Sequence, residues 1–192
     1  DDVVDESNLR RGVFSINAVW KNKIAVLVGD FLLSKGLLLS VKNKEYKMLG
    51  IMSKAVEQMS EGELLQMEKP RKLNLSETDY YKIIRKKTAA LISACCESGA
   101  VAAKQSDTVC EKMKLFGEYA GMAFQIKDDL FDYESNTNIG KPQDIDIKDK
   151  KLTLPIIYSL NRVSYNQKKI IINTIKKDYD NDEKIVELYN IV

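Results

Sequence analysis

The chain has 192 residues, of which 44% are hydrophobic and 30% charged, and this composition is typical of one globular domain with a sizeable core. The formal net charge is only +2, so the charge balance gives no sign of a nucleic-acid-binding protein. The chain has no histidine, which excludes histidine-dependent triads, histidine-ligated zinc and histidine general bases.

The cysteines point to a reducing compartment. Cys95, Cys96 and Cys110 are odd in number and lack zinc-like spacing. We expect the adjacent Cys95 and Cys96 to be small buried residues of a cytoplasmic protein. No signal peptide and no run of eighteen or more apolar residues is found in the sequence, so we expect no transmembrane segment.

Long helices are expected, because only three prolines and nine glycines interrupt the chain. The first covers residues 17–41 and is so apolar that we expect it to be central and buried on most sides. After a turn at residues 42–44, a second helix runs over residues 45–68 and is closed by Pro70.

A third helix is expected to start at Ser76, because Asp79 follows three residues later in a capping pattern, and to end near residue 97. No segment of the chain reads convincingly as a strand, so the predicted fold is all-α. The remaining elements are a helix at residues 107–134, a polar loop at 135–151, a helix with Pro155 in its first turn, and helices near 165–178 and 182–192.

Two acidic motifs of the same form, Asp-Asp-x-x-Asp, occupy residues 1–5 and residues 128–132. Residues four apart lie on one face of a helix, so the outer aspartates of each motif would stack in pairs beside the middle one. Crowded carboxylates repel, and an oxygen-only ligand set that leaves room for water and phosphate suits Mg²⁺. The predicted metal ligands are Asp1, Asp2, Asp5, Asp128, Asp129 and Asp132.

A solvated acidic helix face is the alternative interpretation of a single such motif. The second motif favours the metal site, because the apolar residues 121–126 run directly into it and Phe131 and Tyr133 interrupt it. Solvated charge runs are rarely so apolar. Two facing clusters would hold several Mg²⁺ ions and, through them, a diphosphate.

Several cations are candidates for binding that diphosphate. Arg10 and Arg11 follow the first motif, and their planar groups match phosphate oxygens, although a lone Arg pair is usually a surface feature. Lys87 is expected at a helix edge facing a cavity, with an ordinary snorkelling lysine as an equal alternative. Lys141 and Lys151 flank the loop after the second motif and would close over an anion or simply be solvated.

Further segments accompany the acidic motifs in a fixed order: Arg10-Arg11-Gly12, Gly29-Asp30-Phe31-Leu32, Glu61-Gly62-Glu63-Leu64, Lys87-Thr88-Ala89, Phe124-Gln125 and Gly140-Lys141-Pro142. In order and spacing, over nearly the whole chain, they resemble the trans-polyprenyl diphosphate synthase family. The resemblance implies an isoprenoid synthase-type helical bundle with a product cavity between helices. It also implies a homodimer, with residues 17–41 as a candidate interface.

The resemblance assigns roles to these residues. It implies two or three Mg²⁺ ions on the six motif aspartates, directly or through water. It implies that the allylic diphosphate is held by cations and neighbouring polar groups, and that Arg11 belongs to the isopentenyl diphosphate pocket. The implied allylic site consists of Arg10, Lys87, Thr88, Gln125, Lys141 and Lys151.

The implied reaction is a condensation of an allylic diphosphate with isopentenyl diphosphate, in which the isopentenyl double bond attacks a carbocation. Synthases of this family have several helices before the first motif. We therefore expect residues 1–192 to be a single synthase domain, incomplete at the N-terminus and the C-terminus, and to lack full activity alone. The small residues Ser34 and Gly36 favour a deep cavity and a medium or long product.

Two alternatives remain open at the level of sequence. A terpene cyclase of the same fold usually has a different second metal motif. A catalytically silent subunit of a heteromeric synthase has no reason to retain two sets of mutually repelling carboxylates. Both arguments favour the synthase.

Overall fold

The structure is a computed structural model, and it describes residues 3–4, 8–10, 12–68, 76–131, 133, 152–177 and 179–192. The chain forms two compact units, one up to Gly50 and a larger one from Ile51 onward. In the described residues every element longer than two residues is helical, so the predicted all-α fold is confirmed.

The first unit begins with a small hairpin that the sequence analysis missed. Strand β1 (Leu9–Arg10) pairs antiparallel with β2 (Val13–Phe14), and Gly12 between them has a φ of 78°, which glycine adopts without steric cost. Each strand has only two residues, so no alternation of polar and apolar side chains could have predicted it.

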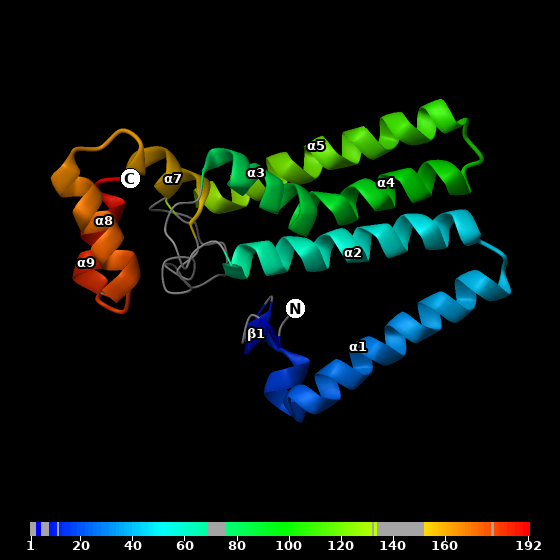
Figure 1. Ribbon diagram of the computed structural model, residues 1–192. Helices are drawn as coiled ribbons and strands as arrows, with labels where there is room; N and C mark the ends of the chain where they lie inside the picture. Colours follow the sequence, from blue (N-terminus) through cyan, green and yellow to red (C-terminus); the bar gives the residue numbers. More distant parts are fainter. Residues whose placement is uncertain are drawn as a thin grey trace. The chain divides into compact units, whose positions relative to one another are not determined.

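Helix α1 (Ile16–Lys42) confirms the position of the first predicted helix (Figure 1). Its backbone breaks at Lys21, with φ 71° and ψ 160°. The predicted burial is wrong, because Asn17 alone is buried along this helix. Besides α1, the described elements of this unit are the hairpin and the start of α2, and these cannot cover a helix about 40 Å long.

Helix α1 bears on the expectation of no transmembrane segment, which stays a prediction. Among the described residues it is the one helix long enough and apolar enough to cross a membrane. The helix contains no unbroken apolar run of that length, because Asp30 and Lys35 interrupt it. Length and composition alone are weak evidence, because a core helix of a soluble protein has the same properties.

The second unit consists of helices that follow the predicted order, with one change. The third predicted helix contains a π-helical turn, η2 (Arg85–Ala89), so it forms three elements in sequence. Ser76 caps its start by the predicted reciprocal bonds with Asp79. The helices are α2 (Tyr46–Glu68), α3 (Glu77–Ile84), α4 (Ala90–Ala102), α5 (Asp107–Phe131), α7 (Leu154–Leu160), α8 (Tyr165–Lys177) and α9 (Asp182–Tyr189).

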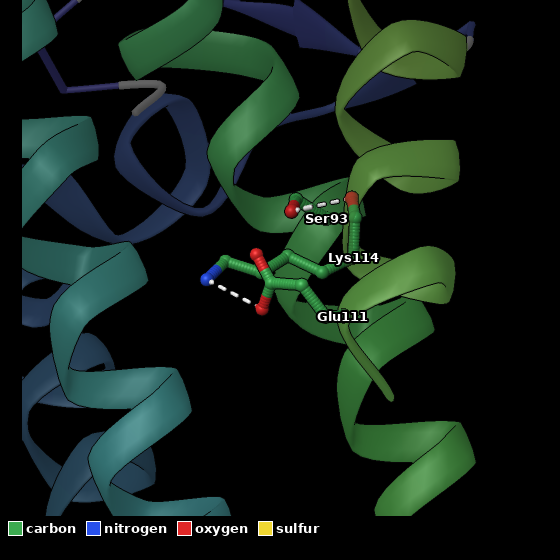
Figure 2. A network of polar contacts seen from close by, with 3 residues as sticks. All are labelled: Ser93, Glu111 and Lys114. Carbon is green, nitrogen blue, oxygen red and sulfur yellow. Dashed lines mark hydrogen bonds and ion pairs between the residues drawn. The ribbon is translucent and has the colours of Figure 1, made fainter. Parts of the chain in front are cut away.

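Helices α4 and α5 lie side by side (Figure 1) and pack closely because α5 has small residues where they meet. A Cβ atom at Gly117 would lie 2.7 Å from the Cα of Ser93, and one at Gly121 would lie 2.7 Å from the Cα of Ala89. Figure 2 shows Ser93 donating a 2.9 Å hydrogen bond from its hydroxyl to the backbone oxygen of Lys114 on α5. Larger side chains at either glycine would force the helices apart.

The main hydrophobic core joins α3 to the C-terminal helices. Tyr80 and Ile84 of α3 pack with buried residues of α7, α8 and α9, and the core also contains Leu152. The central side chains are fully buried and are Ile156, Ile157, Ile171, Ile175, Ile185 and Leu188. The predicted burial of Cys95 and Cys96 is wrong, because Cys95 is exposed and Cys96 is half-buried, whereas Cys110 is buried.

Candidate active site

The π turn η2 places Lys87 and Thr88, two of the predicted substrate-binding residues. A π turn inside an α-helix shifts the register of the following residues, and such turns are frequent at functional sites. Helix α2 reaches this turn closely, because a Cβ atom at Gly62 would lie 2.6 Å from the backbone nitrogen of Lys87. Gly62 is therefore required for this contact.

Each cation of the turn is paired with a carboxylate. Lys87 Nζ lies 2.6 Å from Glu63 Oε2, Arg85 pairs with Glu118 of α5, and Lys86 pairs with Glu61. Lys86 also lowers the pKa of Glu61 below its usual value of 4.5, first by donating a hydrogen bond and then by its charge.

The Lys87 ion pair bears on the snorkelling interpretation of this lysine, while its position facing a cavity stays a prediction. The Lys87 and Glu63 side chains are 28% and 25% exposed, so Lys87 does not extend freely into water as a snorkelling lysine does. Glu63 orients the ammonium group and offsets its charge. An anion that binds Lys87 therefore competes with Glu63.

A continuous chain of hydrogen bonds joins η2 to the second acidic motif on α5. Thr88 donates to Gln125 Oε1 at 2.7 Å, and Gln125 Nε2 donates to Asp129 Oδ1 at 2.8 Å. The hydroxyl of Tyr80 donates to Asp129 Oδ2 at 2.7 Å. Both oxygens of Asp129 thus accept a hydrogen bond from a neighbouring side chain.

Asp128 and Asp129 have different surroundings. Asp129 is 5% exposed, while Asp128 is half-buried. Adjacent helix residues point about 100° apart, so Asp129 can turn inward to the network while Asp128 lies on another side of α5. A buried carboxylate is stable only when it is well hydrogen-bonded, and Tyr80 and Gln125 meet that requirement.

The structure therefore brings together Thr88, Gln125 and Asp129, with Lys87 and Asp128 adjacent to them in sequence. For Arg10, only its place in strand β1 is described. The other predicted site residues lie outside the described residues, and their roles stay predictions: Asp1, Asp2, Asp5, Arg11, Asp132, Lys141 and Lys151.

The donor chemistry at the end of α5 fits Mg²⁺, because its carboxylate ligands are hard oxygens. In the described part of the chain, no three metal-ligating side chains form a group. Asp128 and Asp129 are the two motif aspartates that are described, and the rest of the predicted ligand set lies beyond these residues.

Sequence reasoning missed Tyr80 and Glu63. Glu63 stands in the Glu61-Gly62-Glu63 segment, and a carboxylate beside a glycine that allows close helix contact was a usable signal. For Tyr80 the sequence contains no such signal, because its partner Asp129 is 49 residues away and no local pattern joins the two residues.

The family is decided by comparison with known proteins. The pattern of the polyprenyl synthetase family matches residues 1–192. The chain belongs to the polyprenyl synthetase family. Component 2 of the heptaprenyl diphosphate synthase of Bacillus subtilis strain 168 is 35% identical over 173 residues, 89% of this chain and 50% of that protein. The octaprenyl diphosphate synthase of Escherichia coli K12 is 34% identical over 178 residues, 92% of this chain and 55% of that protein.

Solved polyprenyl synthetase structures have the same fold. A decaprenyl diphosphate synthase from Rhodobacter capsulatus superposes with a TM-score of 0.90 at 33% identity, over 100% of this chain and 59% of that one. A polyprenyl synthase from Caulobacter crescentus CB15, complexed with calcium and isoprenyl diphosphate, superposes with a TM-score of 0.90 at 34% identity. The match covers 100% of this chain and 58% of that one. The isoprenoid synthase-type fold is confirmed. The chain spans about half the length of the curated relatives it matches.

Proposed function

We propose that this chain serves a metal-dependent trans-prenyltransferase, which condenses an allylic diphosphate with isopentenyl diphosphate to make a polyprenyl diphosphate. The observation that carries the proposal is the Thr88–Gln125–Asp129 hydrogen-bond chain. It joins the turn that holds Lys87 to the second acidic motif, within a polyprenyl synthetase fold. The complex of the Caulobacter crescentus relative with calcium and isoprenyl diphosphate supports a divalent cation and a diphosphate ligand.

The cofactor of the proposal is Mg²⁺, in two or three ions. Asp128 and Asp129 would hold it on α5, together with Asp132 and the aspartates of the first motif. When bound, Mg²⁺ stabilises the negative charge of a departing diphosphate.

The chain's own residues contribute in three ways. Lys87 supplies a positive charge to the allylic diphosphate when the anion displaces Glu63. Thr88 and Gln125 hold Asp129 in one orientation. No protein base is needed, because the allylic carbon–oxygen bond ionises, the isopentenyl double bond attacks the cation, and the released diphosphate accepts the proton that is lost. The absence of histidine is therefore no obstacle.

A second candidate is a silent subunit of a heteromeric synthase, and the name of the Bacillus subtilis relative, a component 2, favours considering it. A silent subunit would not need a buried carboxylate held by two donors. The terpene cyclase is disfavoured, because the polyprenyl synthetase pattern spans the whole chain.

We propose a product of medium or long chain, since relatives at 34–37% identity are named heptaprenyl, octaprenyl and nonaprenyl diphosphate synthases. A relative at 32% identity is named a short-chain synthase, so product size needs its own test. Product analysis of the intact enzyme checks it, and a product no longer than farnesyl diphosphate would reject the proposal.

We also propose a cytoplasmic homodimer in which a second copy covers α1. Its side chains Leu27, Leu32 and Leu38 are more than 60% exposed in the single chain, and large exposed apolar surfaces mark interaction sites. Light scattering checks the mass in solution. A monomer at high protein concentration would contradict the dimer.

The experiment that tests the function is thermal unfolding with inorganic diphosphate, with and without Mg²⁺. A specific site stabilises the fold by about 2.7 kcal/mol when the ligand is at about 100 times its Kd. We expect this gain with both ligands present, no gain in Asp128→Ala, and the full gain in Asp180→Ala, a matched change of an exposed aspartate. The full gain in Asp128→Ala would reject the assignment.

A further inference from the structure

Tyr80 is a buried residue of α3 whose polar end reaches the second acidic motif. The residue is 4% exposed, and its ring belongs to the main hydrophobic core. Its hydroxyl donates a 2.7 Å hydrogen bond to Asp129 Oδ2, and Asp129 is itself 5% exposed. A buried hydroxyl and a buried carboxylate at this distance form a strong, charge-assisted bond.

The other oxygen of Asp129 is held from a different direction. Gln125 Nε2 donates to Asp129 Oδ1 at 2.8 Å, and Thr88 in turn donates to the Gln125 carbonyl at 2.7 Å. Asp129 is thus clamped between Tyr80 on α3 and Gln125 on its own helix. These two bonds hold its carboxylate from two directions.

The π turn explains how Tyr80 reaches Asp129 while Thr88 reaches Gln125, one turn away on the same helix. Eight residues of an ideal α-helix would leave Tyr80 and Thr88 about 80° apart around the axis. The turn η2 (Arg85–Ala89) lies between them, and its i→i+5 bonds advance the chain by less rotation per residue. Thr88 therefore comes back toward the face that holds Tyr80.

The spacing of Gln125 and Asp129 on α5 matches the face of the neighbouring helix that holds Tyr80 and Thr88. Gln125 and Asp129 are four residues apart, and Gly121 lies one turn earlier on the same stripe. A Cβ atom at Gly121 would lie 2.7 Å from the Cα of Ala89, the last residue of η2. The backbones are consequently as close as they can be beside the hydrogen-bond chain, and short side chains can span the gap.

We propose that Tyr80 is a positioning residue of the diphosphate site. It fixes the carboxylate of Asp129, and so sets the direction in which the second acidic motif presents its oxygens to a divalent cation. This inference rests on the proposed function, which it deepens by adding a residue outside both acidic motifs. Groups that orient the ligands of a metal contribute to metal affinity without touching the ion.

The decisive variant is Tyr80→Phe, which removes the hydroxyl and keeps the ring in the core. The readout is the Mg²⁺ concentration that gives half of the thermal protection by a fixed concentration of inorganic diphosphate. Loss of an orienting partner typically weakens metal binding 10–100-fold, so we expect this midpoint to rise by about tenfold. The matched control is Tyr81→Phe, a half-buried neighbour whose ring contacts that of Tyr80 and whose Mg²⁺ midpoint should not move.

Two results overturn the inference in distinguishable ways. If Tyr80→Phe lowers the unfolding temperature without ligand but keeps the Mg²⁺ midpoint of the unmodified chain, Tyr80 has only a structural role. If the unmodified chain gains no protection from Mg²⁺ and diphosphate, the proposed function fails, and the inference fails with it. A raised midpoint in Tyr80→Phe, with an unchanged one in Tyr81→Phe, supports it.

Discussion

Helices α1 and α5 have similar lengths, 27 and 25 residues, but they are covered very differently. Helix α5 buries Cys110, Gly117, Gly121 and Asp129, whereas α1 buries Asn17 alone. The more apolar helix is therefore the less buried one. Burial of α5 follows from small residues that admit a neighbouring backbone and from polar side chains that meet across the contact. The apolar composition of α1 does not by itself bury that helix.

The largest contrast in stability is expected between a large apolar side chain of the core and one of α1. Ile171 is fully buried, and removing such a side chain costs about 2–5 kcal/mol because a cavity remains. Leu38 of α1 is 66% exposed, and Leu38→Ala should change the stability of the single chain by less than about 0.5 kcal/mol. Denaturant unfolding of Ile171→Ala and Leu38→Ala at low protein concentration measures both.

The outcome for Leu38 also tests the proposed dimer. If a second copy covers α1, Leu38→Ala should become destabilising as the protein concentration rises, because association then contributes to stability. Equal losses in the two variants at low concentration would contradict the contrast between the helices.

Substitution of glycines should give the next largest change in stability, and the change should have opposite signs on α5 and α1. Gly121→Ala places a Cβ atom 2.7 Å from the Cα of Ala89, so we expect a loss of about 1–3 kcal/mol from overpacking. Gly36 on α1 has nothing within 4 Å of such an atom, so Gly36→Ala should gain about 0.5–1 kcal/mol from helix propensity. Thermal unfolding of both variants checks the signs, and a stabilising Gly121→Ala would disprove the close approach.

A smaller effect is expected on ligand affinity from the ion pair at the π turn. Glu63→Gln removes the partner of Lys87, and a pair of this exposure contributes about 1 kcal/mol. Diphosphate would no longer compete with Glu63, so its Kd with Mg²⁺ should fall about fivefold. Calorimetric titration measures this. Glu61→Gln, which frees the neighbouring Lys86 instead, is the matched control; equal effects of both variants would reject a specific role for Lys87.

The smallest effect is the pH dependence that Glu61 contributes. Lys86 lowers the pKa of Glu61 in the folded chain, so the pair stabilises the fold above the unfolded pKa, and this contribution is lost as pH falls through the folded pKa. Glu61→Gln removes this contribution, so it should lower stability slightly at neutral pH and leave the acid end unchanged, which flattens the profile. The change is small because both partners are in reach of solvent. Thermal unfolding of both chains between about pH 3 and about pH 7, a range that includes the reference pKa of glutamate, measures this pH dependence. A steeper acid side in Glu61→Gln would contradict the expected direction.

Helix positions were predictable from the sequence because local signals fix them. The Ser76–Asp79 capping pair marked the start of α3, and the prediction was confirmed by the reciprocal bonds. The π turn was not predictable, because its register shift is stabilised by partners far along the chain, such as Gly62 and Gly121. Burial of α1 was predicted wrongly because apolar character shows what a helix can pack with, not whether a partner is present.

The candidate site divides in the same way. Thr88, Gln125 and Asp129 were predicted from motifs, and the structure joins them by hydrogen bonds. Tyr80 was missed because a bond across 49 residues leaves no periodic trace. The Lys87–Glu63 pair was missed because two surface-type side chains give the same sequence signal whether or not they meet.

The central claim is that the carboxylates at the end of α5 hold a metal–diphosphate complex. Calorimetric titration of inorganic diphosphate into the unmodified chain and into Asp128→Ala, each with and without Mg²⁺, tests this most directly. We predict binding by the unmodified chain only when Mg²⁺ is present, and none by Asp128→Ala. Binding of equal strength without the metal, or undiminished binding by Asp128→Ala, would contradict the account.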